Sequence, residues 1–155
     1  MVFVKYFCII SATLIFVSQS CWASDLHKNY LLSEAIKEHR VNLCAEGLGG
    51  HSKKCLFVNI KNTSSLPIQI TVDPALIFRP VDSNQQDLVT AGSEYLVLAP
   101  LESKSISLNA FCGKSYAHSP SRNTKFIFFK QGSHAFIETM RFISKHKLFN
   151  SIGQA

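Results

Sequence analysis

The sequence predicts a mainly β protein, an antiparallel β-sandwich with one helix at each end. Roughly six to eight short stretches alternate apolar and polar residues, and turn residues recur about every 8 to 12 positions, as is typical of β-sandwiches. A length of 155 residues, 46% apolar and 17% charged, suits one compact domain and excludes wholesale disorder. The net charge of +6 is scattered along the chain, without runs of like charge.

Residues 1–23 are predicted to be a cleaved secretory signal peptide. One cation precedes the apolar run 7–17, and small Ala23 stands just before the expected cut. The run is too short to cross a membrane, because a spanning helix needs roughly 20 residues. Residues 24–155 are therefore expected to form a single secreted or periplasmic domain without a transmembrane helix. A lipid anchor on Cys21 is the alternative.

The first elements of the mature chain are expected to be a short helix and two strands. Apolar residues at roughly helical spacing predict the helix within 30–38. Alternation over 56–61 and again over 68–73 predicts two strands, each with one buried face. The polar turn residues 63–67 lie between them. We therefore expect a hairpin from Cys55 to Asp73.

Further strands are expected in the second half of the chain. They cover 76–78, 87–90, 95–98, 105–112 and 125–130. A tight turn is expected between the second and third of these, at Ala91-Gly92-Ser93. In 105–112, Leu108 and its alternate neighbours are expected to face the core, and Ser107 the solvent. The four successive apolar residues within 125–130 predict a central strand covered on both faces.

The last predicted element is an amphipathic helix that begins at His134. Ser133 is the expected N-cap residue. The apolar stripe of this helix consists of Phe136, Ile137, Met140 and Ile143. Cations in its last turn complement the helix dipole.

Two turn motifs resemble those of a known class of module. Segment 62–68 reads NTSSLPI and segment 98–103 reads LAPLES, each with a proline in the expected turn. Over about residues 55–129 this pattern resembles the immunoglobulin-like β-sandwich modules of bacterial secreted and surface proteins, in an uncharacterised branch. The resemblance implies an immunoglobulin-like sandwich in a cell-surface or periplasmic setting, and it brings no catalytic residues. Leu101 stands where that turn usually has glycine.

The cysteines of the mature chain predict one disulfide and one free thiol, since export exposes them to an oxidising compartment. We expect Cys44 to pair with Cys55 across the glycine-rich segment 47–50, which is predicted to be a hairpin loop. Cys112 would then be a buried free thiol. Its pairing with either of the other two cysteines stays open.

Other features of the sequence could carry chemistry, but ordinary structural roles account for them. The potential metal ligands are His39, Cys44, His51, Cys55 and Cys112. Their positions lack the short paired spacing of structural zinc sites. Cys112 and His118 could imitate a thiol and its base, but no signature supplies a third group. Asn62-Thr63-Ser64 is a glycosylation sequon expected in an exposed turn. We therefore expect no enzyme, no metal and no cofactor.

The candidate binding loop is 113–123, together with the strand that follows. Its candidate contact residues are Lys114, Tyr116, His118, Arg122 and Lys125. A basic loop on an exported chain favours a protein or an anionic glycan as partner, and no nucleic acid is expected. The alternative function is a small secreted inhibitor, or immunity-like protein, that blocks an enzyme through this loop.

Overall fold

The computed structural model describes residues 28–82, 84–113 and 116–146, and these form a mainly β fold with a helix near each end. The signal peptide, Cys21 and Lys114 lie outside the described residues. The strands are β1 (Asn29–Leu31), β2 (Val41–Leu48), β3 (Leu56–Asn62), β4 (Ile68–Val72), β5 (Leu76–Pro80), β6 (Leu88–Thr90), β7 (Glu94–Leu98), β8 (Ser103–Leu108), β9 (Ala110–Cys112) and β10 (Arg122–Gln131). The helices are α1 (Leu32–Lys37) and α2 (His134–Lys145).

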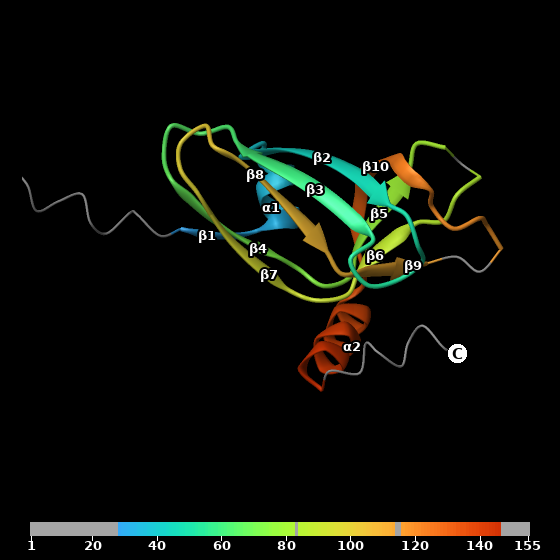
Figure 1. The fold of residues 1–155 in the computed structure, drawn as a ribbon. Helices are drawn as coiled ribbons and strands as arrows, with labels where there is room; N and C mark the ends of the chain where they lie inside the picture. The colour runs from blue at the N-terminus through green and yellow to red at the C-terminus, as the bar shows by residue number, and fades with distance from the viewer. Residues whose placement is uncertain (1–27, 83, 114–115, 147–155) are drawn as a thin grey trace, which may run out of the picture.

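Two sheets enclose the core. The larger has seven strands in the order β8-β3-β2-β10-β5-β6-β9, all in antiparallel pairs, and it curls into a half-barrel (Figure 1). The smaller has the order β1-β4-β7 and is mixed, because β1 pairs with β4 in parallel. In Figure 1 the small sheet lies below β3 and β8, with α1 beside β2.

One hydrophobic core joins the two sheets and α1. Fully buried side chains come from α1, from the large sheet and from the small sheet: Leu32, Leu56, Ile60, Ile70, Phe78, Leu98 and Leu108. The predicted alternation of β3, β4 and β8 is confirmed, since their inward residues belong to this core or pack against it. Strands β1 and β2 were not predicted.

The predicted hairpin from Cys55 to Asp73 is wrong, because β3 and β4 belong to different sheets. The chain changes sheet at Asn62, whose side chain is fully buried. Its amide nitrogen donates to the carbonyl oxygens of Leu66 at 2.8 Å and Ala99 at 2.9 Å. These bonds hold a corner in place of a two-strand turn. The expected exposure of the sequon is therefore wrong for Asn62, although Thr63 is exposed.

The predicted tight turn at 91–93 is also a change of sheet. Strand β6 pairs with β5 and β9 in the large sheet, whereas β7 pairs with β4 in the small one. Strand 105–112 divides at Asn109 into β8 and β9, which form the two opposite edges of the large sheet. The half-barrel curls because these two edges belong to one continuous segment of chain.

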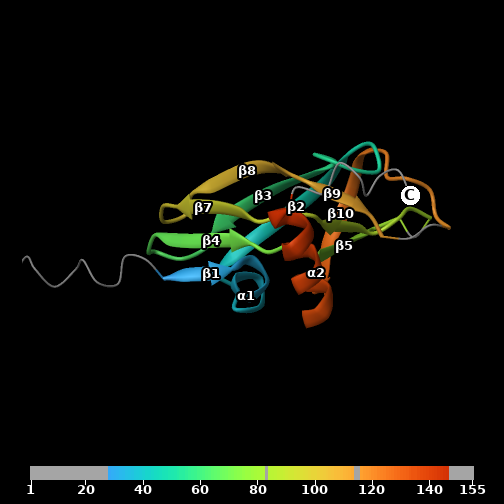
Figure 2. The ribbon, with the colours of Figure 1, turned by 90° about the horizontal axis from the view of Figure 1, so that it is seen from below.

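Both predicted helices are present. Helix α2 begins at His134, and the Ser133 hydroxyl accepts a hydrogen bond from the backbone N–H of Phe136 at 3.3 Å. The apolar stripe of α2 packs around buried Met140 on Ala75 and Ala91, outside the main core (Figure 2). The predicted turn at 100–103 is present between β7 and β8, with Leu101 at a φ of +59°.

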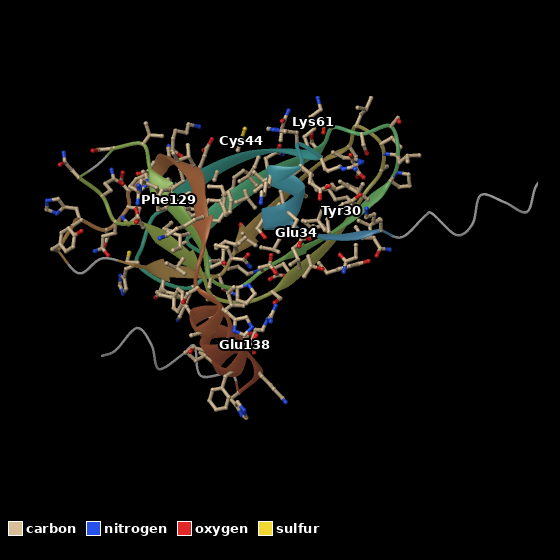
Figure 3. All side chains as sticks on the ribbon, turned by 180° about the vertical axis from the view of Figure 1, so that it is seen from behind. Tyr30, Glu34, Cys44, Lys61, Phe129 and Glu138 are labelled. Atoms are coloured by element: carbon tan, nitrogen blue, oxygen red, sulfur yellow. The ribbon has the colours of Figure 1, made fainter. Side chains whose placement is uncertain are left out.

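The expected Cys44–Cys55 disulfide is not formed, and all three cysteines of the described residues are free. Cys44 lies opposite Asn59 in the β2–β3 ladder, so four residues of strand length separate Cys55 from that position. This is about 13 Å at ~3.3 Å per residue, whereas a disulfide needs Cα atoms within about 7 Å. Cys44 is exposed, with its sulfur directed away from the sheet (Figure 3), and Cys55 is buried.

Candidate functional site

The outer side of β10 carries an exposed apolar surface in the middle of the large sheet. Strand β10 lies between β2 and β5, and Phe126 faces the core with 5% of its surface exposed. The alternate residues Ile127 and Phe129 face outward and are 55% and 42% exposed. The prediction that this strand is covered on both faces is therefore wrong. Large apolar side chains that share an exposed face are characteristic of interaction surfaces.

Arg79 of β5 completes this surface. It lies opposite Ile127 in the β10–β5 ladder, and its guanidinium carbon is 3.5 Å from the centroid of the Phe129 ring. Lys130 places its ammonium nitrogen 5.4 Å from the same centroid. Such cation–π contacts fix the position of both partners. We call Arg79, Lys125, Ile127, Phe129 and Lys130 the β10 face (Figure 3 labels Phe129).

The charge of the β10 face is positive. Lys125 forms an ion pair with Glu46 of β2, and Arg79 Nε lies 3.7 Å from Asp87 Oδ1. Lys130 makes no ion pair with any described residue. Apolar surface beside cations suits a partner that offers both apolar groups and negative charge.

The structure separates the candidate residues of the predicted binding loop into two groups. Arg122 belongs to β10 and not to the loop, and Lys125 lies in β10 as the predicted strand 125–130 implies. Tyr116 remains in the loop and is 85% exposed. His118 fastens the loop to the segment before β6: its N–H donates to the Asn84 carbonyl at 3.2 Å, and its carbonyl accepts from the N–H of Gln86 at 3.0 Å.

Sequence reasoning missed Arg79, Ile127 and Phe129 as site residues. The apolar run between Lys125 and Lys130 was the available signal, but it was interpreted as core. No signal in the sequence links Arg79 to Phe129, because the pair depends on the register of β5 with β10.

Two thiols are poor nucleophiles, that of buried Cys55 and that of Cys112, which is half-buried where full burial was expected. Burial raises the pKa of Cys55 to about 11, and the nearby Cys112 adds to the shift. Burial also raises the pKa of Cys112. Because the thiolate is the reactive form, both groups are largely unreactive near neutral pH.

The part of the chain that the structure describes contains no cluster of metal-ligating side chains. No group of three His, Cys, Asp or Glu side chains is placed to hold a metal ion there. None of the described helices is long and apolar enough to cross a membrane. A scan against protein-family models finds no match to the chain, and searches of curated proteins and of solved structures find none either.

Proposed function

We propose that the protein is an exported, non-enzymatic binding module that contacts a protein or an anionic glycan in the cell envelope or outside the cell. The observation that carries the proposal is the exposure of Ile127 and Phe129 on the central strand of the large sheet, next to cations. Aromatic residues, phenylalanine included, and arginine are enriched in protein interfaces, and both are present on the β10 face.

A protein partner is favoured over a glycan. Sugars bind aromatic rings by stacking on an open ring face, and the Arg79 guanidinium already lies over one face of Phe129. Ile127 offers apolar contact without hydrogen bonding, which suits an apolar side chain better than a sugar hydroxyl. An anionic glycan is therefore the alternative partner, and binding of a heparin probe tests it separately from binding of a peptide.

Two further elements belong to this proposal. Export depends on the signal peptide expected over residues 1–23. The finer fold class is the immunoglobulin-like sandwich, and a core shared by two sheets supports it. Its common form has four strands against three, whereas the described residues of this chain form seven against three.

The test is capture of a partner from the native envelope by the purified mature protein. The variant Ile127→Ser with Phe129→Ser removes the apolar part of the β10 face. Tyr95→Ser with Val97→Ser is a matched control, because these side chains on the small sheet are 56% and 45% exposed. We expect the first double variant to lose the partner and the control to retain it. Equal capture by both would contradict the proposal.

A second candidate, an enzyme inhibitor, is favoured by the loop that carries Tyr116. This side chain is the most exposed of the large apolar residues described, at 85%, and backbone bonds of His118 tie the loop to residues 84–86. A protruding loop fixed in advance is suited to entering an active site. Stoichiometric inhibition of one secreted hydrolase, lost in Tyr116→Ala and kept in Phe129→Ser, would favour this function over the first.

A further inference from the structure

We infer that Arg79 is a preoriented receptor for a carboxylate of an acidic protein segment. This inference rests on the proposed function, since it names the chemistry that the β10 face recognises. Arginine binds carboxylates through two parallel N–H donors, and it does so best when its planar group is held in one orientation.

Two contacts hold the guanidinium of Arg79. Its carbon lies 3.5 Å from the centroid of the Phe129 ring, and its Nε lies 3.7 Å from Oδ1 of Asp87, whose side chain is 10% exposed. The Nε atom itself is buried. One contact fixes the group from its face and the other from its inner edge, so little rotational freedom remains to be lost on binding.

The outer end of Arg79 is available to a partner. The side chain as a whole is 42% exposed although Nε is buried, so the exposure lies in its other atoms. Among the described residues its ion pair runs through Nε, which leaves the terminal nitrogens for a partner. These are the donors that form a paired contact with a carboxylate.

The surroundings of Arg79 select an acidic residue that has apolar neighbours. Ile127 lies opposite Arg79 in the ladder and is 55% exposed. A partner that covers Ile127 would exclude water beside the guanidinium, and charge-assisted hydrogen bonds strengthen as water is excluded. We therefore expect a glutamate or aspartate flanked by apolar side chains.

The test measures binding of two fluorescent probes to the mature protein: a peptide of alternating glutamate and leucine, and heparin as the anionic glycan. Arg79→Lys keeps the charge and removes the planar pair of donors. Lys61→Gln is the matched control, because Lys61 is an exposed cation of β3 without an ion pair among the described residues. We expect Arg79→Lys to weaken peptide binding about tenfold and Lys61→Gln less than about twofold.

A second measurement needs no substitution at Arg79. In the NMR spectrum of the wild-type protein, the Nε–H signal of Arg79 should shift as the peptide is added. As a separate control, the melting temperature of each variant shows whether that variant has folded. Equal peptide affinity of wild type and Arg79→Lys, or an unmoved Nε–H signal, would overturn the inference. If heparin binds in a way that depends on Arg79 and the peptide does not bind, the inference that the partner is a protein is wrong. If Arg79→Lys still captures the envelope partner that Ile127→Ser with Phe129→Ser loses, the inference falls and the proposed function stands.

Discussion

Replacing Asn62 with alanine is expected to destabilise the protein by about 3 kcal/mol, far more than an exposed substitution on the same strand. Asn62 ends β3 and is fully buried. Its amide nitrogen donates to the Leu66 and Ala99 carbonyls at 2.8 and 2.9 Å, and its amide oxygen accepts from the N–H of Ser64 at 2.9 Å. One side chain therefore joins the β3–β4 corner to the β7–β8 turn.

The magnitude follows from the three shortest bonds that the Asn62 side chain makes to backbone groups. A hydrogen bond contributes about 1 kcal/mol net, and a buried group left without a partner costs about 1 to 3 kcal/mol. Leu66 and Ala99 are themselves exposed residues, so water can reach their carbonyls once the amide is gone. The lower figure therefore applies to each bond. Asn62→Asp keeps the acceptor and loses both donors, so its loss should be about 2 kcal/mol or more.

The assay is urea unfolding followed by circular dichroism. Asn59→Ala is the matched control, because the Asn59 amide bonds to the Ser105 hydroxyl at 2.9 Å in an exposed position of β3. Its loss should stay within about 0.5 kcal/mol. If Asn62→Ala and Asn59→Ala lowered the free energy of unfolding equally, Asn62 would not hold the corner.

Three further results are expected. Iodoacetamide at pH 8 should label exposed Cys44 first and Cys55 only in denaturant, by peptide mass spectrometry, because the pKa of Cys55 is raised to about 11; equal labelling rates would contradict its burial. Burial raises the pKa of Asp73, so the folded state keeps this proton to higher pH than the unfolded chain. The stability that this proton contributes is present below the ordinary aspartate pKa and is lost as pH rises through the raised pKa of Asp73. Urea midpoints measured from pH 3 to 7 should therefore fall with rising pH in the wild type and not in Asp73→Asn. Parallel profiles of the two proteins would refute the raised pKa. Leu108→Ala should lower the free energy of unfolding by about 2 to 5 kcal/mol in urea melts, and Ser107→Ala should leave it nearly unchanged; equal losses would mean that the facing of β8 is wrong.

The sequence predicts which side of a strand is buried better than it predicts which strand is its neighbour. Leu56 and Ile70 face the core as their alternation indicates. Alternation reports one face of one strand, and it is the same whether the next strand continues the sheet or crosses to another. The crossing depends on the buried amide of Asn62, and an asparagine before a polar turn has the same appearance in an ordinary hairpin.

The β10 face was harder to predict because its exposure depends on which elements leave β10 uncovered. Four successive apolar residues indicate a strand with both faces covered, and Phe126 satisfies that expectation on the inner side. The small sheet packs across the core, and α2 packs on Ala75 and Ala91, so neither covers Ile127 or Phe129. Whether a strand is covered on its second face is decided by the placement of distant elements.

The end of β10 shows how a local irregularity produces the arrangement on which the proposed recognition depends. Regular alternation after buried Phe126 would turn Phe128 inward, Phe129 outward and Lys130 inward, which would bury a charge. The β10–β5 register shifts between Phe128 and Lys130, and both Phe129 and Lys130 are exposed. A bulge of this kind redirects one side chain without breaking the strand. It therefore leaves the Phe129 ring in contact with two cations, Arg79 at 3.5 Å and Lys130 at 5.4 Å, and gives the β10 face its combination of aromatic surface and positive charge.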